Sequence, residues 1–336
     1  MKNGKIKEYS LRTVKVFGVV LAIVLIGKLL RYILVDDSTS YTRIMLHELY
    51  SQDENIDVLF LGSSHVYRSI DTKIMDRMLN CNTFNAGTSS QRLDGSYTLL
   101  KEVCKYNDIK EVYLDMYYWV MQEPDDMDEM NPVETYIISD YMRPSLNKYT
   151  YIAESTNKET WPNGYILARR EWEKIFDIES VKKTIDRKRS IDYKEFKYIE
   201  NEDEYYAGKG YVASYALYKP FEDSLEELKI MEKGISDESS RYLSKIISIC
   251  KRKGIRLTLI SVPMTSQMLS HLEDYSEYER TIKSIAETNE IEYWDFNIME
   301  NARFEDESDF KDKHHLNKNG AEKFSVLLAE HANNGK

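Results

Sequence analysis

The most apolar stretch of the chain lies near its N-terminus. Val16 to Gly27 contains no polar side chain, and beyond Lys28 the apolar character resumes as far as Val35. A helix rises 1.5 Å per residue, and a bilayer core needs about 20 apolar residues to be crossed. The 22 residues from Val14 to Val35 are long enough, so the sequence predicts a transmembrane helix over residues 14–35.

The charges that flank this span predict its direction. Residues 1–35 carry seven Lys/Arg and one acid, Glu8, whereas Asp36 and Asp37 follow the span. Basic residues before a span keep that side in the cytoplasm. A cleaved signal peptide would show a small-x-small site after the apolar run, and none is evident. We therefore expect a single-pass cell-membrane protein with a cytoplasmic basic tail (1–13), a retained signal anchor (14–35) and an extracellular domain (36–336).

Beyond the anchor, short apolar runs alternate with amphipathic stretches. Residues 57–62 form an apolar run that ends in glycine and predicts a buried strand. Similar runs predict strands at 83–85, 111–118, 255–262 and 291–295, and helical stripes predict helices at about 71–79, 93–104, 242–250, 272–288 and 319–332. Strands that alternate with helices indicate an α/β fold with a parallel sheet covered on both faces.

One long region breaks this rhythm. Residues 122–237 are rich in charge and tyrosine and hold no clear apolar strand. We interpret them as a helical, partly irregular insertion, in which Gly208 to Tyr215 is the best candidate for an extended piece.

Charge and cysteine content exclude several classes of function. The net charge is -11, and beyond residue 35 the chain holds 39 basic and 56 acidic residues. Such an acidic body argues against a nucleic-acid partner, because phosphate binding needs a basic surface. The three scattered cysteines fit neither a disulfide framework nor a zinc site, and His47 and His271 lack a ligand set. We expect no metal and no cofactor.

Residues with catalytic chemistry follow three predicted strands, where ligands bind in open parallel sheets. Ser64 follows the first strand in Gly-Ser-Ser-His, and Asp312 precedes His315 by three residues before the last helix. A serine hydroxyl needs a base to accept its proton, and a carboxylate orients that base. Taken singly, each motif also fits an ordinary turn or a helix cap, with Asn317 as the better N-cap.

Three blocks together resemble the SGNH (GDSL-type) hydrolase superfamily: Gly62-Ser63-Ser64, Asn85-Ala-Gly87 and Asp312-x-x-His315-Leu-Asn-x-x-Gly320. The resemblance covers about residues 55–332. It implies a three-layer α/β/α sandwich with a five-stranded parallel, flavodoxin-like sheet. It also implies Ser64 as nucleophile, His315 as base and Asp312 as the orienting acid, with the backbone N–H groups of Ser64 and Gly87 as oxyanion donors.

The chain departs from that family pattern at two positions. Ser63 stands where the familiar motif has Asp, and Asp115 stands where a third block should supply an asparagine donor. An ionised Asp115 cannot donate a hydrogen bond, which leaves Tyr117, Tyr118, a residue of the insertion, or no third donor. His314 is an alternative base. The candidate substrate contacts are Asn85, His65, Asp115 and Tyr117.

A Gly-Ser-Ser block behind one N-terminal anchor is most similar to the DltD-like branch, which serves teichoic-acid D-alanyl transfer, and to the anchored proteins of alginate-type O-acetylation. This resemblance implies an extracellular serine esterase or O-acyltransferase that forms an acyl-serine intermediate. Its substrate would be a cell-envelope polysaccharide or a teichoic-acid-like polymer, and its partner a membrane-bound O-acyltransferase. The alternative is a non-catalytic, SGNH-like binding or assembly partner of that acyltransferase.

Overall fold

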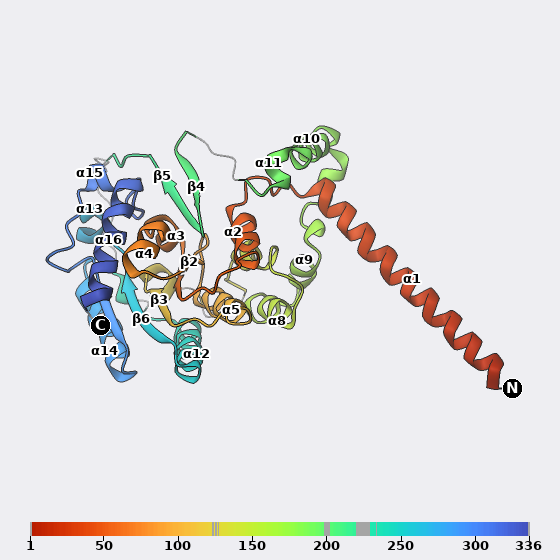
Figure 1. The fold of residues 1–336 in the computed structure, drawn as a ribbon, viewed down its shortest axis with the longest axis horizontal. Helices are drawn as coiled ribbons and strands as arrows, with labels where there is room; N and C mark the ends of the chain where they lie inside the picture. Colours follow the sequence, from red (N-terminus) through yellow and green to blue (C-terminus); the bar gives the residue numbers. More distant parts are fainter. Residues whose placement is uncertain are drawn as a thin grey trace. The chain divides into compact units, whose positions relative to one another are not determined.

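The computed structural model describes residues 2–122, 124, 126, 128–197, 202–219, 229–232 and 234–334, with side chains from Arg12 onward. The chain divides into two compact units (Figure 1). We call Met1–Thr39 with Glu159–Lys197 the anchor unit, and Ser40–Lys158 with Tyr198–Lys336 the sheet unit. Each unit is described by itself.

The sheet unit is built on a five-stranded parallel sheet with the strand order β2-β1-β3-β6-β7. The strands are β1 (Val58–Leu61), β2 (Thr83–Asn85), β3 (Glu111–Asp115), β6 (Arg256–Ser261) and β7 (Glu292–Asp295). The sequence prediction of this α/β fold is confirmed. Strands β1, β2 and β3 are buried along their whole length, as expected for strands covered on both faces.

Helices cover both faces of the sheet, and alternate residues of β1 point to opposite sides. Val58 and Phe60 belong to one core cluster with the residues of α3 (Ser64–Ser69), α4 (Thr72–Leu79) and α16 (Lys318–Asn334). Leu59 and Leu61 belong to the other, with α2 (Tyr41–Tyr50), α5 (Leu93–Val103), α6 (Tyr118–Met121), α12 (Asp237–Lys253) and α14 (Tyr275–Thr288). This is the expected three-layer sandwich. The short helices η3 (Ile230–Glu232), α13 (Ser266–His271) and α15 (Asp306–Asp309) lie in its connections.

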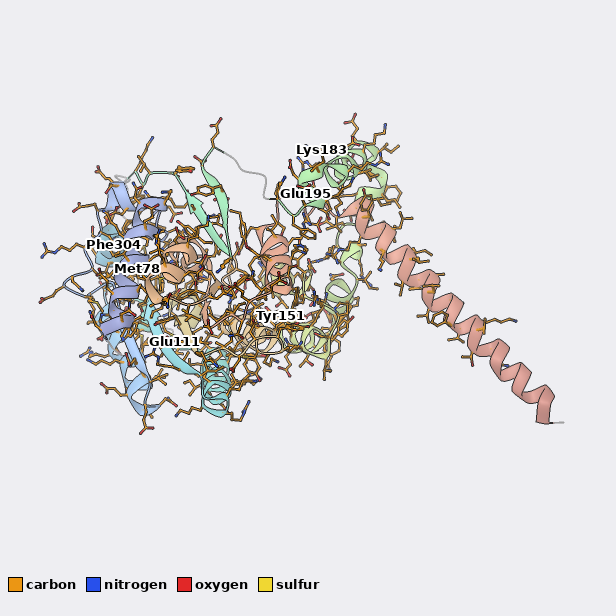
Figure 2. All side chains as sticks on the ribbon, viewed as in Figure 1. Met78, Glu111, Tyr151, Lys183, Glu195 and Phe304 are labelled. Atoms are coloured by element: carbon orange, nitrogen blue, oxygen red, sulfur yellow. The ribbon has the colours of Figure 1, made fainter. Side chains whose placement is uncertain are left out.

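The predicted insertion is shared between the two units. Helices α7 (Pro132–Ser139) and α8 (Leu146–Ser155) belong to the sheet unit, where Tyr151 of α8 packs beside Gly95 of α5 (Figure 2). The elements between Glu159 and Lys197 belong to the anchor unit instead: α9 (Trp161–Tyr165), η1 (Leu167–Arg169), η2 (Trp172–Phe176), α10 (Ile178–Arg189) and α11 (Ile191–Lys194). Residues 123, 125, 127, 198–201, 220–228 and 233 of the expected insertion lie outside the described residues.

The extended piece expected near residues 208–215 is part of an antiparallel hairpin of β4 (Glu204–Gly208) and β5 (Tyr211–Ser214). The hairpin turn lies against the end of β2, where the Asn85 N–H donates to the Lys209 carbonyl at 2.9 Å. Gly210 has φ +83°, and a Cβ there would lie 1.7 Å from the Asn85 oxygen. Only glycine permits this approach of two backbones.

The anchor unit contains one long N-terminal helix, α1 (Lys2–Leu34). Its segment Arg12–Leu34 is long and apolar enough to cross a membrane, a property that signal sequences share. The helix ends one residue before the predicted boundary at Val35 and continues back through the basic tail.

Candidate active site

The turn after β1 places Ser64 at an accessible position. Ser64 is half-buried and begins α3, whose N-cap is Ser63; the Ser63 hydroxyl accepts the His65 N–H at 3.4 Å. A Cβ at Gly62 would lie 2.5 Å from the Val66 side chain and 2.8 Å from Asp115 Cβ. Glycine is therefore required for the strand to turn this sharply into the helix.

The structure brings Ser64, His315 and Asp312 together, although 251 residues separate the first two in sequence. His315 Nε2 lies 2.8 Å from the Ser64 hydroxyl. His315 Nδ1 lies 2.8 Å from Asp312 Oδ1 and 2.9 Å from Oδ2. When Nδ1–H donates to the carboxylate, Nε2 is left to accept the serine proton. This is the arrangement that general-base activation of a serine needs.

The loop around Asp312 keeps its carboxylate ionised. Oδ1 accepts the backbone N–H groups of His314 at 2.9 Å and His315 at 3.0 Å, besides the His315 ring. Burial opposes ionisation, but the hydrogen bonds and the charge of His315 outweigh it and hold the Asp312 pKa below its usual value. Asp312 is thus a fixed anion beside the ring.

The Asn317 side chain stabilises the same loop through hydrogen bonds. Its side-chain nitrogen donates to the Ser308 and Phe310 carbonyls at 2.9 and 3.1 Å, and its oxygen accepts the Gly320 N–H at 3.1 Å. The last contact is the N-cap that the sequence suggested for the final helix. A Cβ at Gly320 would lie 2.1 Å from the Asp309 oxygen. The Asn-x-x-Gly part of the block therefore holds the loop that carries His315, a role that sequence reasoning missed.

His314, the alternative base, points elsewhere. Its Nδ1 lies 3.2 Å from the Tyr117 hydroxyl. Burial and the charge of His315 lower the His314 pKa to about 4. Within the described chain His315, and not His314, makes the hydrogen bond to Ser64.

The two expected oxyanion donors differ in availability. The Ser64 N–H has no hydrogen-bond acceptor within the described residues. The Gly87 N–H, in contrast, donates to Asn85 Oδ1 at 3.1 Å. The Asn85 amide is fixed by donating to the Val66 and Ile70 carbonyls at 2.9 and 3.3 Å. An oxyanion would have to displace the Asn85 oxygen to accept the Gly87 N–H, so the role of Gly87 as an oxyanion donor stays a prediction.

Three of the four candidate substrate contacts lie inside the protein. Asn85, His65 and Asp115 are only 0, 1 and 2% exposed. The fold encloses the end of each side chain, so direct contact with a substrate stays a prediction for these three residues. Tyr117 remains half-buried, and its ring stacks on His65 with 3.8 Å between centroids.

His65 and Asp115 are also poorly partnered. Within the described residues both His65 ring nitrogens and Asp115 Oδ2 lack a hydrogen-bond partner, while Asp115 Oδ1 accepts the Val262 N–H at 3.3 Å. Burial, with the charges of His315 and His314, lowers the His65 pKa, and burial raises the Asp115 pKa to about 7. Both residues line a cavity of about 10 Å³, which has room for about one water molecule.

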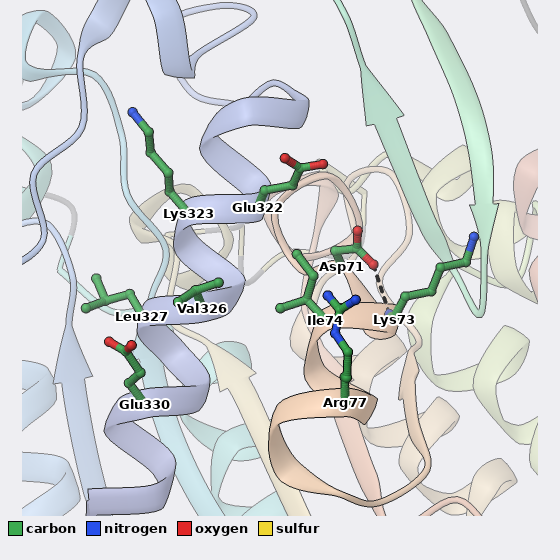
Figure 3. Close-up of a pocket in the computed structure, with 9 residues that line it drawn as sticks. All are labelled: Asp71, Lys73, Ile74, Arg77, Glu322, Lys323, Val326, Leu327 and Glu330. Carbon is green, nitrogen blue, oxygen red and sulfur yellow. Dashed lines mark hydrogen bonds between the residues drawn. The ribbon is translucent and has the colours of Figure 1, made fainter.

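A wider hollow lies away from these residues. It has a volume of about 790 Å³ and lies between α4 and α16 (Figure 3). Ile74, Val326 and Leu327 form its apolar part, and side chains of both charges surround them. No triad residue lines it. In the described residues, no group of three or more His, Cys, Asp or Glu side chains could hold a metal ion.

Comparisons with known proteins add little beyond the fold. A family model that carries no description matches residues 179–335. No curated protein matches the chain. A crystal structure from Bacteroides fragilis, of a protein provisionally named an acylhydrolase, is similar over 86% of this chain and 93% of its own. Its TM-score is 0.40 and its sequence identity is 11%. At that level the likeness carries no weight for function, which has to be inferred from the residues of this chain.

Proposed function

We propose that the chain is a serine hydrolase or acyltransferase acting on ester bonds, with Ser64 as nucleophile, His315 as base and Asp312 as the orienting acid. The observation that carries this proposal is the unbroken chain of contacts at 2.8 Å from the Ser64 hydroxyl through His315 to Asp312. The half-buried position of Ser64 supports it, because an ester carbonyl has to reach the hydroxyl.

The reaction would run in two halves. Ser64 Oγ attacks the ester carbonyl carbon while its proton passes to His315 Nε2, and Asp312 stabilises the imidazolium. The negative charge on the carbonyl oxygen is placed near the Ser64 N–H. Collapse breaks the bond to the leaving alkoxide, which takes the proton from His315. Water or a sugar hydroxyl then attacks the acyl-serine, with His315 again as base, and regenerates Ser64.

For substrate and location we propose acyl groups on a cell-envelope polysaccharide or a teichoic-acid-like polymer, outside the cell membrane. The resemblance of the three sequence blocks supports this, as does the N-terminal helix, which is long and apolar enough to hold the chain in a membrane. A membrane-bound O-acyltransferase is the proposed partner. An esterase would pass the acyl group to water, and a transferase would pass it to a polymer hydroxyl.

The test is the turnover of p-nitrophenyl acetate by the full chain in detergent. We expect Ser64→Ala to lower kcat/KM by about a thousandfold or more, because the nucleophile is removed. The matched control is Ser270→Ala, which removes an exposed hydroxyl on α13 and leaves turnover unchanged. Equal turnover by wild type and Ser64→Ala would overturn the proposal.

One observation favours a second candidate, a non-catalytic binding or assembly partner of an acyltransferase. The Gly87 N–H is bonded to Asn85, and Asp115 occupies the position of the third donor, so of the expected donors only the Ser64 N–H has no acceptor within the described residues. Losing a donor typically costs about 10²- to 10³-fold in rate. If deletion of the protein abolishes surface acylation and the Ser64→Ala chain restores it, this second function is the correct one.

A further inference from the structure

The anchor unit exposes a concentrated group of large apolar side chains. Within residues 172–178, Trp172 is 54% exposed, Ile175 49%, Phe176 78% and Ile178 67%. The Trp172 and Phe176 rings meet edge to face at 6.0 Å. Scattered single apolar residues are normal on a protein surface, but a cluster of this kind marks an interaction site.

This cluster belongs to a helical segment that packs against α1. We call residues 159–197 the collar; its elements η1, η2 and α10 all contact α1 (Figure 1). From Val14 to Ile26 the side chains of α1 are exposed, whereas Gly27 is partly covered and Leu34 is buried. The collar therefore covers only part of the last two turns of the helix, where Leu29 and Tyr32 stay exposed.

One buried and one partly exposed ion pair hold the collar to the residues that follow α1. Lys188 Nζ lies 3.0 Å from Asp37 Oδ1, with side chains only 2 and 3% exposed, and it donates to the Arg31 carbonyl at 3.3 Å. Arg187 pairs with Asp36. Breaking a buried ion pair leaves an uncompensated charge in the interior, so the collar and the helix end form one body.

The position of the collar along α1 sets its depth in a membrane. The 21 residues from Val14 to Leu34 span about 30 Å, which equals the thickness of a hydrocarbon core. Since the collar begins to cover the helix at Gly27, it starts about 10 Å before the helix ends. That is the depth at which interfacial helices place their apolar faces, between headgroups and acyl chains.

The charge of the anchor unit fits an anionic membrane surface. The collar contains ten Lys/Arg and eight Asp/Glu, and with residues 1–39 the unit has a net charge of +6. The remainder of the chain has a net charge of -17. Lys183 (Figure 2) and Arg189 are exposed basic side chains of α10. Basic side chains near a surface are attracted to anionic lipid headgroups.

We propose that residues 172–178 are a second membrane contact, inserted between the headgroups of an anionic bilayer beside the point where α1 leaves it. The contact would fix the tilt of α1 and hold the collar against the surface. The proposal rests on the proposed membrane location of α1 and is independent of the Ser64 chemistry.

The test uses the full chain in vesicles of phosphatidylcholine and phosphatidylglycerol that contain bromine-labelled acyl chains, which quench inserted tryptophans. The chain has four tryptophans. We expect Trp172→Phe to lose most of the quenchable fluorescence, because Phe keeps the apolar contact but removes the fluorophore. The matched control, Trp119→Phe, removes a residue of the sheet unit that is 64% exposed and leaves the quenching unchanged. Equal quenching in both variants overturns the proposal.

A second variant tests the energetic role of the cluster. Phe176→Asp places a charge at the centre of the contact. We expect trypsin to cut after Lys174 several times faster in this variant than in wild type, with both chains in vesicles. Leu146→Asp, at an apolar residue of the sheet unit that is 83% exposed, is the control and leaves the rate unchanged. Identical cutting rates in detergent for all three chains show that folding is intact. If Phe176→Asp and wild type are cut after Lys174 at the same rate in vesicles, the proposed contact is overturned.

Extraction with alkaline carbonate separates failure of the anchor from failure of the contact. A chain that resists extraction while Trp172 stays unquenched retains α1 as an anchor and loses the proposed contact. A chain that is extracted loses both. Turnover of p-nitrophenyl acetate, measured on the same samples, reports on Ser64 separately.

Discussion

Two histidine rings, His65 and His315, lie with 5.4 Å between their centroids, and their surroundings differ completely. His315 is half-buried in a loop, and both of its ring nitrogens are hydrogen-bonded, one to Ser64 and one to Asp312. His65 is 1% exposed, and neither of its nitrogens has a partner in the described chain. From its position after the nucleophile, the sequence made His65 a candidate substrate contact only.

The carboxylates repeat this contrast. Hydrogen bonds from the loop hold the Asp312 pKa below its usual value in spite of burial, whereas burial raises the Asp115 pKa to about 7. The loop from Phe310 to Asn317 provides hydrogen-bond partners for both Asp312 oxygens and both His315 nitrogens, whereas in the described chain Asp115 has a partner for one oxygen only and His65 has none. The same two residue types are therefore suited to proton transfer on one side and to packing on the other.

The largest effect is expected from Asp312→Asn. Asn cannot stabilise the imidazolium and favours the wrong tautomer of His315, so kcat for p-nitrophenyl acetate should fall about a thousandfold or more. His314→Gln is the control on the same loop and should stay within about tenfold of wild type, because His314 makes no contact with Ser64. If His314→Gln proves the more damaging change, the roles of the two loop histidines are exchanged.

The second effect concerns stability and pH. In the folded chain the Asp115 pKa is about 7, so the carboxyl keeps its proton up to about that pH. In the unfolded chain the pKa is near 3.8, and the proton is released there. Wild-type stability should therefore fall as pH rises from about 4 to about 7, by up to about 4 kcal/mol. Asp115→Asn cannot titrate. It should match wild type at pH 4 and be more stable at pH 8, as measured by urea unfolding.

The control for this prediction is Asp295→Asn. Burial also raises the Asp295 pKa, but its carboxylate accepts hydrogen bonds from Tyr275, Tyr293 and Asn297. In Asp295→Asn an NH2 group replaces one carboxylate oxygen, and it cannot accept the hydrogen bonds that Tyr275, Tyr293 and Asn297 donate. The unfolding free energy of this variant should therefore fall by about 1–3 kcal/mol at pH 8. A gain in stability for both variants would show that burial, rather than the lack of partners, distinguishes the interior.

The smallest effect is expected from His65→Phe. The phenyl ring can keep the stacking on Tyr117 and removes two nitrogens without partners. Unfolding free energy should change by less than about 1 kcal/mol, in either direction, and turnover should remain close to wild type. A loss of activity as large as that of Asp312→Asn would contradict the distinction between the two histidines, because it would place His65 in the proton-transfer chain.

Strand β1 could be predicted from sequence because both faces of the sheet are covered, which makes this strand a continuous apolar run. The hairpin at Glu204–Ser214 was visible only in part. The β4 residues are half-buried, so no apolar run marks them. The collar was missed as a distinct element because α10 is held by ion pairs to Asp36 and Asp37, and pairs between distant residues leave no local pattern.

The candidate site shows the same division. Ser64, Asp312 and His315 stand in short motifs, and the structure brings His315 within hydrogen-bond distance of both Ser64 and Asp312. The bond between Gly87 and Asn85 could not be foreseen. It depends on how the carbonyls of Val66 and Ile70, on another element, orient one amide. Residue identity could be read from the sequence, but the direction of a side chain could not.

The turn at Gly210 has a consequence for the behaviour of the protein in concentrated solution. Strand β2 is the outermost strand of the sheet, and an uncovered outer strand is a template on which other copies can add strands and aggregate. The Lys209 carbonyl already occupies the N–H of Asn85 at the end of this strand. Any side chain at position 210 would push the hairpin turn away from Asn85, and the solubility of the protein would then depend on how quickly neighbouring molecules reach the bare strand.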